Sequence, residues 1–165
     1  MEWLVIAVCA VLSGADTFVA IEVLFWKIAM KPGRPMAFGR IHACDHDRAA
    51  WLFGLPGNPV AVMVTFYPFV RDALFLLMGV EPLPPLPLVP AVCSEALKKS
   101  PGRTEFQRGI LRYDQGQWEV RPAGAQGSGI LRSMAEAHCF IVLEHDRGRV
   151  ATGETVGVQL FEGLT

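Results

Sequence analysis

The sequence predicts an α/β unit with a parallel sheet, followed by a small antiparallel β-barrel-like domain. Ahead of residue 81, apolar strands alternate with apolar helical runs, which is typical of a parallel sheet covered on both faces. The stretch EPLPPLPLVP, residues 81–90, holds five prolines in ten residues and favours an extended connector. Short β-rich segments follow it. We therefore divide the chain into residues 1–82, a linker over residues 83–90, and a β domain over residues 91–165.

The β domain is predicted from five short segments that are rich in branched and aromatic residues and bounded by turns. They are residues 88–97, 104–114, 117–123, 139–146 and 154–162. The tetrapeptide DQGQ, residues 114–117, joins two of these segments and predicts a tight hairpin. Such a series of short strands and turns indicates a small antiparallel barrel or sandwich.

Composition narrows the class of protein. The 165 residues are 52% hydrophobic with a formal net charge of −1, which favours a soluble globular protein. The near-neutral charge argues against a strongly basic nucleic-acid binder, so we expect no nucleic acid as a partner. The four cysteines have no repeated spacing, so we expect reduced thiols in a cytoplasmic protein rather than a disulfide framework.

Two apolar stretches resemble targeting or membrane segments. Residues 3–12 are too short to span a bilayer and no basic residue precedes them, so we expect a buried strand, with a signal peptide as the alternative. Residues 59–80 contain Pro68 and two charged side chains, which favours a buried helix over a membrane span. We therefore expect no membrane as a partner.

The segment GLPGNPV, residues 54–60, joins a predicted strand to a predicted helix. Asn58 is a favoured N-cap and Pro59 a favoured first helical residue. The free N–H groups of the first helical turn would point over the end of the strand, where open α/β sheets bind ligands. Gly57 would let a ligand approach the backbone closely. The segment is thus either an oxyanion or phosphate cradle or a well-capped structural turn.

Cationic side chains gather upstream, in FWKIAMKPGRPMAFGR, residues 25–40. Lys27, Lys31 and Arg34 have no acidic neighbour in this segment, and in an extended strand Lys27 and Lys31 share one face. Such a group predicts a local anion site. Taken alone, a solvated cationic loop explains the same residues.

Two further segments give weaker signals. Arg103 and Arg108 lie around a predicted turn and strand, and Ser128 can cap a short helix after a glycine-rich loop, so that each can contact an anion. The segment HACDH, residues 42–46, holds residue types that bind metals. Because no second cluster lies at zinc-site spacing, we interpret this segment as a polar loop.

Several of these segments occur together and in one order. They are Lys27-x-x-x-Lys31-Pro32-Gly33-Arg34-Pro35, Gly54-Leu55-Pro56-Gly57-Asn58-Pro59-Val60, Pro101-Gly102-Arg103 with Phe106-Gln107-Arg108-Gly109, and Gln126-Gly127-Ser128 with Cys139-Phe140-Ile141-Val142-Leu143-Glu144. In these motifs the chain resembles the molybdopterin molybdenumtransferase family, the MoeA-like proteins related to the E domain of gephyrin. The resemblance runs from residue 23 to about residue 162 and concerns the carboxy-terminal portion of the family's proteins.

The resemblance implies insertion of molybdate into adenylylated molybdopterin with release of AMP, assisted by Mg²⁺. It implies that residues 1–80 are the second half of a molybdopterin-binding α/β domain. It also implies a homodimer, with a pocket between the α/β domain of one subunit and the β domain of its partner. Molybdate would be positioned by Lys27, Lys31, Arg108 and Ser128. The pterin phosphate would be bound by Arg34, Gly54, Pro56, Gly57, Asn58 and Pro59.

The resemblance is incomplete near the amino terminus. There the family has a Ser-Gly-Gly-Val-Ser turn and an acidic helix that helps to hold magnesium. This sequence reads AVCAVLSGADTFVAIE, in which Asp16 is the remnant of the acidic position. From this departure we expect a fragment or the product of a frame-shifted gene, inactive alone. A non-catalytic molybdopterin-binding or scaffold fragment is the alternative function.

Overall fold

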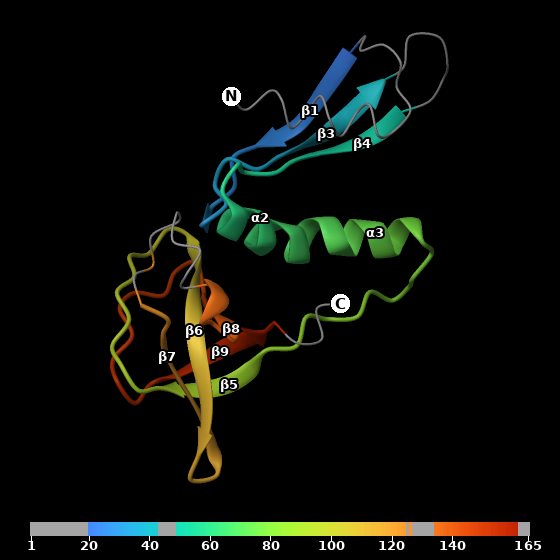
Figure 1. Cartoon of the computed structure of the whole chain (residues 1–165). Coiled ribbons are helices and arrows are strands. Elements are labelled where there is room, and N and C mark those ends of the chain that lie inside the picture. The colour runs from blue at the N-terminus through green and yellow to red at the C-terminus, as the bar shows by residue number, and fades with distance from the viewer. Residues whose placement is uncertain (1–19, 43–48, 125, 127–133, 162–165) are drawn as a thin grey trace.

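The computed structural model describes residues 20–42, 49–124, 126 and 134–161. In Figure 1 a three-stranded sheet lies at one end of the molecule and a β-barrel at the other. One long helix runs between them. The fold class is confirmed in outline, since strands and a helix come first and a β-barrel follows.

The three-stranded sheet contains β1 (Ala20–Trp26), β3 (Ala37–His42) and β4 (Ala49–Gly54), in the order β1-β3-β4. Both pairings are antiparallel, so the prediction of parallel strands is wrong for these three. The connections over residues 27–36 and 43–48 are shorter than the dozen or more residues that a parallel crossover needs. The strand expected over residues 3–12 lies outside the described residues.

The helix begins where the sequence predicts. Asn58 caps α2 (Pro59–Thr65), and its Oδ1 accepts hydrogen bonds from the N–H groups of Val60 at 3.0 Å and Ala61 at 3.2 Å. The helix continues as the π-helical segment η1 (Phe66–Arg71) and then as α3 (Asp72–Leu77). Pro68 lies in the π-helical part, where the changed hydrogen-bond register accommodates a residue that has no N–H group.

The prediction of a buried helix over residues 59–80 holds only for its first turns. Val60 and Val64 are 1% exposed because they pack with Phe140 of the barrel. Leu77 and Met78 are 64% and 74% exposed, so the helix end presents apolar side chains to solvent. Among the described residues, Pro59–Leu77 is the one helix long and apolar enough to cross a membrane, a criterion that core helices of soluble proteins also meet.

The barrel contains five strands, which confirms the five β segments that the sequence predicts. They are β5 (Val89–Cys93), β6 (Thr104–Asp114), β7 (Gln117–Pro122), β8 (Cys139–Leu143) and β9 (Thr155–Leu160). The ring closes because β6 pairs with β7 along one part of its length and with β8 along the other. The predicted hairpin at residues 114–117 is confirmed, with Gln115 and Gly116 both at positive φ.

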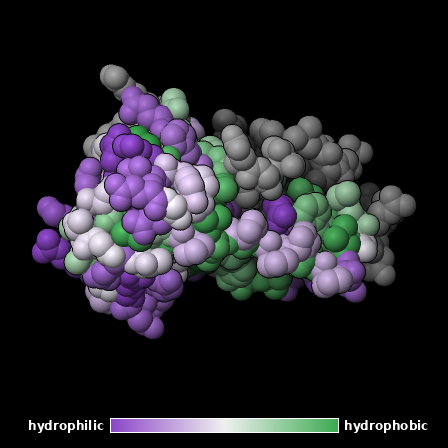
Figure 2. Space-filling model, turned by 90° about the horizontal axis from the view of Figure 1, so that it is seen from below, coloured by the Kyte–Doolittle hydropathy of each residue, from purple (hydrophilic) through white to green (hydrophobic). Residues whose placement is uncertain are grey.

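One pairing in the ring, β5 with β7, is parallel, unlike the all-antiparallel arrangement that we predicted. A closed ring with an odd number of strands cannot alternate in direction throughout, so at least one parallel pair is required. Figure 2 shows that polar residues dominate one face of the barrel, whereas apolar residues gather beside it.

A short strand from the first part of the chain joins this sheet. β2 (Met30–Lys31) pairs in parallel with Thr104–Glu105, and the N–H of Thr104 donates to the carbonyl of Ala29 at 2.9 Å. Lys31 is thereby placed against the barrel rather than against the three-stranded sheet. The division at residues 82 and 90 stays a prediction.

The barrel interior is a continuous apolar cluster. Its buried members are Ala91, Cys93, Leu97, Val120, Cys139, Ile141, Leu143, Val150, Val156 and Val158. A second cluster joins the helix to the outside of the barrel through Met30, Val60, Val64 and Phe140. This second cluster fixes the helix start beside the strands that carry the polar residues described below.

The thiol of Cys139 gives the barrel a predictable pH dependence. Burial raises the pKa of this thiol to about 12. In the unfolded chain the thiol ionises near its ordinary pKa of about 8.5, so above that pH the unfolded chain binds fewer protons than the folded one. The free energy of unfolding should therefore fall as the pH rises from about 8.5 towards about 12.

Urea unfolding over this alkaline range tests the prediction. Cys139→Ala should lower stability at neutral pH, because it shortens a buried side chain, but should make the alkaline loss of stability less steep. Equal pH dependence in the variant and the parent chain would contradict the assignment to Cys139.

Candidate functional site

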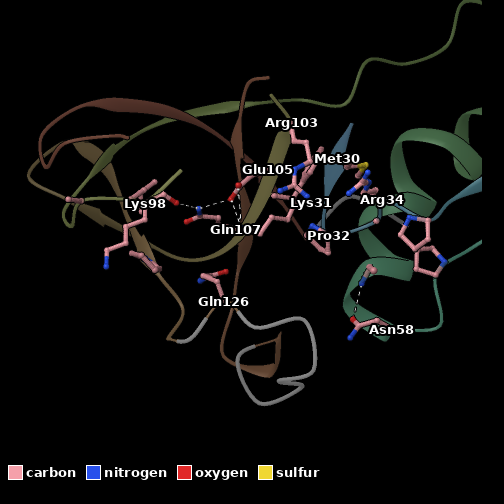
Figure 3. Close-up of a pocket in the computed structure, with 18 residues that line it drawn as sticks. Met30, Lys31, Pro32, Arg34, Asn58, Lys98, Arg103, Glu105, Gln107 and Gln126 are labelled. Atoms are coloured by element: carbon pink, nitrogen blue, oxygen red, sulfur yellow. Dashed lines mark hydrogen bonds and ion pairs between the residues drawn. The ribbon is translucent and has the colours of Figure 1, made fainter. Parts of the chain in front are cut away.

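A cavity of about 840 Å³ lies where the segment after β2, the turn before α2 and the barrel meet. Figure 3 shows its labelled side chains, which come from both parts of the chain. Four cationic residues line it: Lys31, Arg34, Lys98 and Arg103. Among the described lining residues the one carboxylate is Glu105. The lining is therefore positively charged, although the whole chain carries a net charge of −1.

Lys31 is held by a polar network on β6. Its Nζ lies 3.4 Å from both carboxylate oxygens of Glu105, which is 5% exposed. The Nε2 of Gln107 donates to Glu105 at 3.3 Å and to the carbonyl of Lys98 at 2.9 Å. The side chain of Lys31 remains 56% exposed, so its ammonium group faces the cavity while its position is fixed from behind.

Glycine is required at one position of the loop that carries Arg34. Gly33 has a φ of 112°, and a Cβ there would lie 2.6 Å from the Cγ2 of Thr65 in α2. The loop after β2 is therefore packed closely against the helix. This contact places Arg34 at the edge of the cavity beside the helix start.

The turn before α2 lines the cavity with Pro56 and Asn58. The predicted cradle of free N–H groups is not formed, because the Oδ1 of Asn58 already accepts from Val60 and Ala61. Pro59 has no N–H group to offer. For the N–H groups of Val60 and Ala61, the structure therefore agrees with the capped structural turn, one of the two alternatives for this segment. Anion binding in the cavity therefore depends on cationic side chains.

Lys27 and Lys31 do not share one face of a strand, and that prediction is wrong. Lys27 follows the end of β1 with a φ of 69°, in the left-handed region, and its N–H donates to the carbonyl of Met36. Its Nζ lies 4.0 Å from the ring centroid of Trp26. The chain turns between the two lysines, so the period-two argument does not apply to them.

Arg108 lies on β6 and is 2% exposed. Burial lowers the pKa of its guanidinium group. The amide of Gln126 brackets its backbone, since Oε1 accepts from the N–H of Arg108 at 2.9 Å and Nε2 donates to its carbonyl at 3.0 Å. The contribution of Arg108 to a pocket shared with a partner subunit stays a prediction.

The structure brings some of the predicted site residues together and not others. The cavity lining includes Lys31, Arg34, Pro56 and Asn58. It does not include Lys27, Gly54, Gly57, Pro59 or Arg108. Asp16 and Ser128 lie outside the described residues, as do residues 43–46 of the HACDH segment. The roles of all these residues in binding remain predictions.

Sequence reasoning missed Lys98, Glu105 and Gln107 as site residues. Each lies in or beside a predicted strand, where a polar side chain is unremarkable. The pairing of β2 with β6 brings these residues to the site. It joins segments 74 residues apart, and the sequence of neither segment indicates this pairing. Glu105 also corrects the expectation of a cationic group without an acidic neighbour.

The described residues do not supply a metal site. No group of three or more His, Cys, Asp or Glu side chains that can hold a metal ion occurs among them. The described part of the chain therefore offers no magnesium site made of protein ligands alone, and Asp16 lies outside that part. We derive no chemical step through magnesium.

Comparisons with known proteins agree with this two-part architecture. The model of a probable molybdopterin binding domain matches residues 8–75, and that of the MoeA C-terminal region, domain IV, matches residues 90–161. A molybdopterin molybdenumtransferase of Haemophilus influenzae is 44% identical over 144 residues, which are 87% of this chain and 34% of that protein.

Solved structures show the same relation. A molybdenum cofactor biosynthesis protein from Pyrococcus furiosus is 31% identical with a TM-score of 0.64, over 86% of this chain and 46% of that one. The molybdopterin biosynthesis moeA protein of Pyrococcus horikoshii is 26% identical with a TM-score of 0.63, over 86% of this chain and 33% of that one.

These matches define a molybdopterin-binding domain followed by a MoeA-type C-terminal barrel. The chain belongs to the molybdopterin molybdenumtransferase (MoeA-like) family, to whose carboxy-terminal portion it corresponds. The chain spans about a third of the length of the curated relatives that it matches.

Proposed function

We propose that this chain takes part in molybdenum cofactor biosynthesis, in the insertion of molybdate into adenylylated molybdopterin with release of AMP. One observation supports this proposal above the others. Four cations, of which two belong to motifs near the helix start and two to the barrel side, line one cavity of about 840 Å³. Both reactants are anions, and a pocket for them should be rich in Lys and Arg.

The residues of the chain would act by binding and positioning. Lys31, Arg34, Lys98 and Arg103 can hold an oxyanion and screen its repulsion from a phosphorylated pterin. Glu105 fixes Lys31, so the ammonium group is pre-organised before the anion arrives. Pro56 and Asn58 would form the wall against the pterin. No nucleophile of the protein is needed, because the two pterin thiols would bind the metal in place of one oxo group, which would leave as water with the two thiol protons.

Three further features belong to this proposal. A cytoplasmic location is supported by the free thiols of Cys93 and Cys139. A homodimer would bring Arg108 and Ser128 to the lysines of a partner subunit. Magnesium would act through Asp16 and residues of the complete family member. Nucleic acid and membrane are not part of the proposed function.

Replacing Arg34 by glutamine tests the proposal. The side chain is exposed and its loss should leave the fold intact, but the affinity of the chain for molybdate should fall about two- to fivefold. Arg34→Gln combined with Arg103→Gln should lower the affinity about tenfold or more. Isothermal titration with molybdate at low ionic strength measures both values, and AMP release in a complete homologue with the same changes measures activity.

Arg112→Gln is the matched control, because Arg112 is an exposed arginine in the β6–β7 hairpin, outside the cavity. Its molybdate affinity should equal that of the parent chain. Equal affinities in the parent chain and in the double variant would contradict the proposal.

A non-catalytic pterin-binding module is the second candidate. The incomplete resemblance near the amino terminus favours it, because Asp16 is the one remnant of the acidic segment that holds magnesium in the family. Binding of the pterin without AMP release, with and without added magnesium, would identify this function.

A further inference from the structure

A second, smaller cavity adjoins the first. It has a volume of about 290 Å³ and shares Lys31, Lys98 and Glu105 with the larger cavity. Lys99, Ser100 and Arg149 complete its lining. The two cavities are therefore two parts of one groove, with the Lys31–Glu105 ion pair on the wall between them. Of these lining residues, Lys31 alone belongs to the motifs identified in the sequence.

Two cations, Lys98 and Arg149, line the smaller cavity from neighbouring segments of the chain. Leu97 and Val150 form an antiparallel bridge, with both backbone hydrogen bonds present, at 2.9 and 3.1 Å. In this register the next residue on one side, Lys98, is opposite the preceding residue on the other side, Arg149. Like charges directly opposite one another are destabilising in paired strands. An anion that contacts both side chains would relieve the repulsion between them.

The backbone at both cations is fixed in place. The carbonyl of Lys98 accepts from Gln107, which is itself buried. On the other side the Nζ of Lys99, which is 8% exposed, donates to the carbonyls of Ser100 at 3.3 Å, His145 at 3.2 Å and Arg147 at 2.7 Å. The bonds to His145 and Arg147 tie the segment ahead of Arg149 to the segment after Lys98, so the backbones that carry the two cations are held together.

The side chains of these cations are available to a ligand. Lys98 and Arg149 are both exposed, and no side chain of the described residues forms an ion pair with either of them. Lys99 differs from them, because its three donors are satisfied by the carbonyls. A ligand in the smaller cavity would thus contact Lys98 and Arg149, with Lys31 beside them.

We infer that Lys98 and Arg149 form a second anion subsite that binds a phosphate group of a phosphate ester. This inference rests on the proposed function, because a substrate with two anionic groups would place one group in each cavity. The carboxylate of Glu105 lies on the wall between the two cavities and would repel an anionic group placed there. It would therefore favour a substrate whose two anionic groups are separated, one in each cavity. The described residues that line the smaller cavity include no aromatic side chain, so we expect the subsite to recognise the phosphate group through Lys98 and Arg149.

Arg149→Gln in the full 165-residue chain tests this inference, because Arg149 lines only the smaller cavity. Binding is measured by isothermal titration at low ionic strength with AMP, inorganic phosphate, adenosine and molybdate as separate probes. The affinity for AMP should fall about fivefold, and Arg149→Lys should restore most of it. The affinity for molybdate should stay within about twofold of that of the parent chain.

The four probes distinguish a phosphate ester from free phosphate. They also distinguish failure of the subsite from failure of the proposed function. Equal binding of AMP and inorganic phosphate, with none of adenosine, supports a subsite for phosphate alone, and stronger binding of AMP supports a phosphate ester. Loss of molybdate binding in the parent chain with the Arg149 effect on AMP intact would reject the proposed function and keep the subsite. Unchanged AMP binding in Arg149→Gln, or no binding of AMP and phosphate by the parent chain, would overturn the subsite.

A measurement without ligand gives a second check. If Lys98 and Arg149 repel one another in the free chain, Lys98→Gln should raise the melting temperature slightly, and saturating phosphate should raise that of the parent chain more than that of the variant. A lower melting temperature for Lys98→Gln, with no difference in the response to phosphate, would contradict the inference.

Discussion

Replacing Gly109 by valine should strongly destabilise the barrel. Gly109 is the one residue of β6 that pairs with both neighbouring strands, with Pro122 of β7 and Cys139 of β8. A Cβ there would lie 2.9 Å from each of three side-chain atoms, of Val120, Cys139 and Ile141. These atoms belong to the fully buried core and have no space to move into, so we expect a loss of about 3 kcal/mol or more.

Urea unfolding followed by circular dichroism measures this loss. Gly148→Val is the matched control, because a Cβ at Gly148 meets nothing within 4 Å and its φ is not positive. The control should stay within about 0.5 kcal/mol of the parent chain. Equal stability of the two variants would show that the interior of the barrel is not packed as described.

Phe140→Ala should destabilise the contact between the helix and the barrel. Phe140 is 1% exposed and its ring lies 6.3 Å from that of Phe106 and 4.7 Å from that of Phe161, in edge-on arrangements. It packs with Val60 and Val64 of α2. Removal of the ring leaves a void between elements that cannot both collapse into it, and the expected loss is about 3–5 kcal/mol.

The same variant should also affect the site. Because α2 carries Asn58 at its start and its turn lines the cavity, a displaced helix should weaken molybdate binding as well as lower stability. Phe66→Ala, which removes a ring that is 36% exposed, should lower stability much less and leave binding unchanged. A stability loss for Phe140→Ala no larger than that for Phe66→Ala would be inconsistent with its role.

Features of the fold that depend on neighbouring residues could be predicted from the sequence. The hairpin at residues 114–117 and the helix start at Asn58-Pro59 are determined by the backbone preferences of a few adjacent residues. The barrel strands were predictable because branched and aromatic residues recur between turns.

Features that depend on distant residues could not be predicted in the same way. The antiparallel order of β1, β3 and β4 depends on the lengths of connections whose ends the sequence does not mark. The ion pair of Lys31 with Glu105 depends on a strand pairing between the two parts of the chain. The apolar pattern of residues 59–80 indicates a helix but not which neighbour buries it, so the exposure of α3 was missed.

The candidate site shows the same division. Lys31 and Arg34 line the same cavity as the turn before α2, and their part in binding stays a prediction. Asn58 caps the helix as predicted, and its side chain occupies the N–H groups of Val60 and Ala61, which favours the capped turn of the two alternatives. A good N-cap residue is therefore a poor indicator of a free helix start.

The pairing of β2 with β6 has a consequence for the order in which the molecule assembles. It brings together residues 74 positions apart, whereas the β6–β7 hairpin forms between adjacent segments. Long chain closures are entropically unfavourable and slow, so local hairpins precede them. Lys31 would therefore contact Glu105 only after the barrel has formed. A newly synthesised chain should gain the ability to bind anions in the last step of its folding.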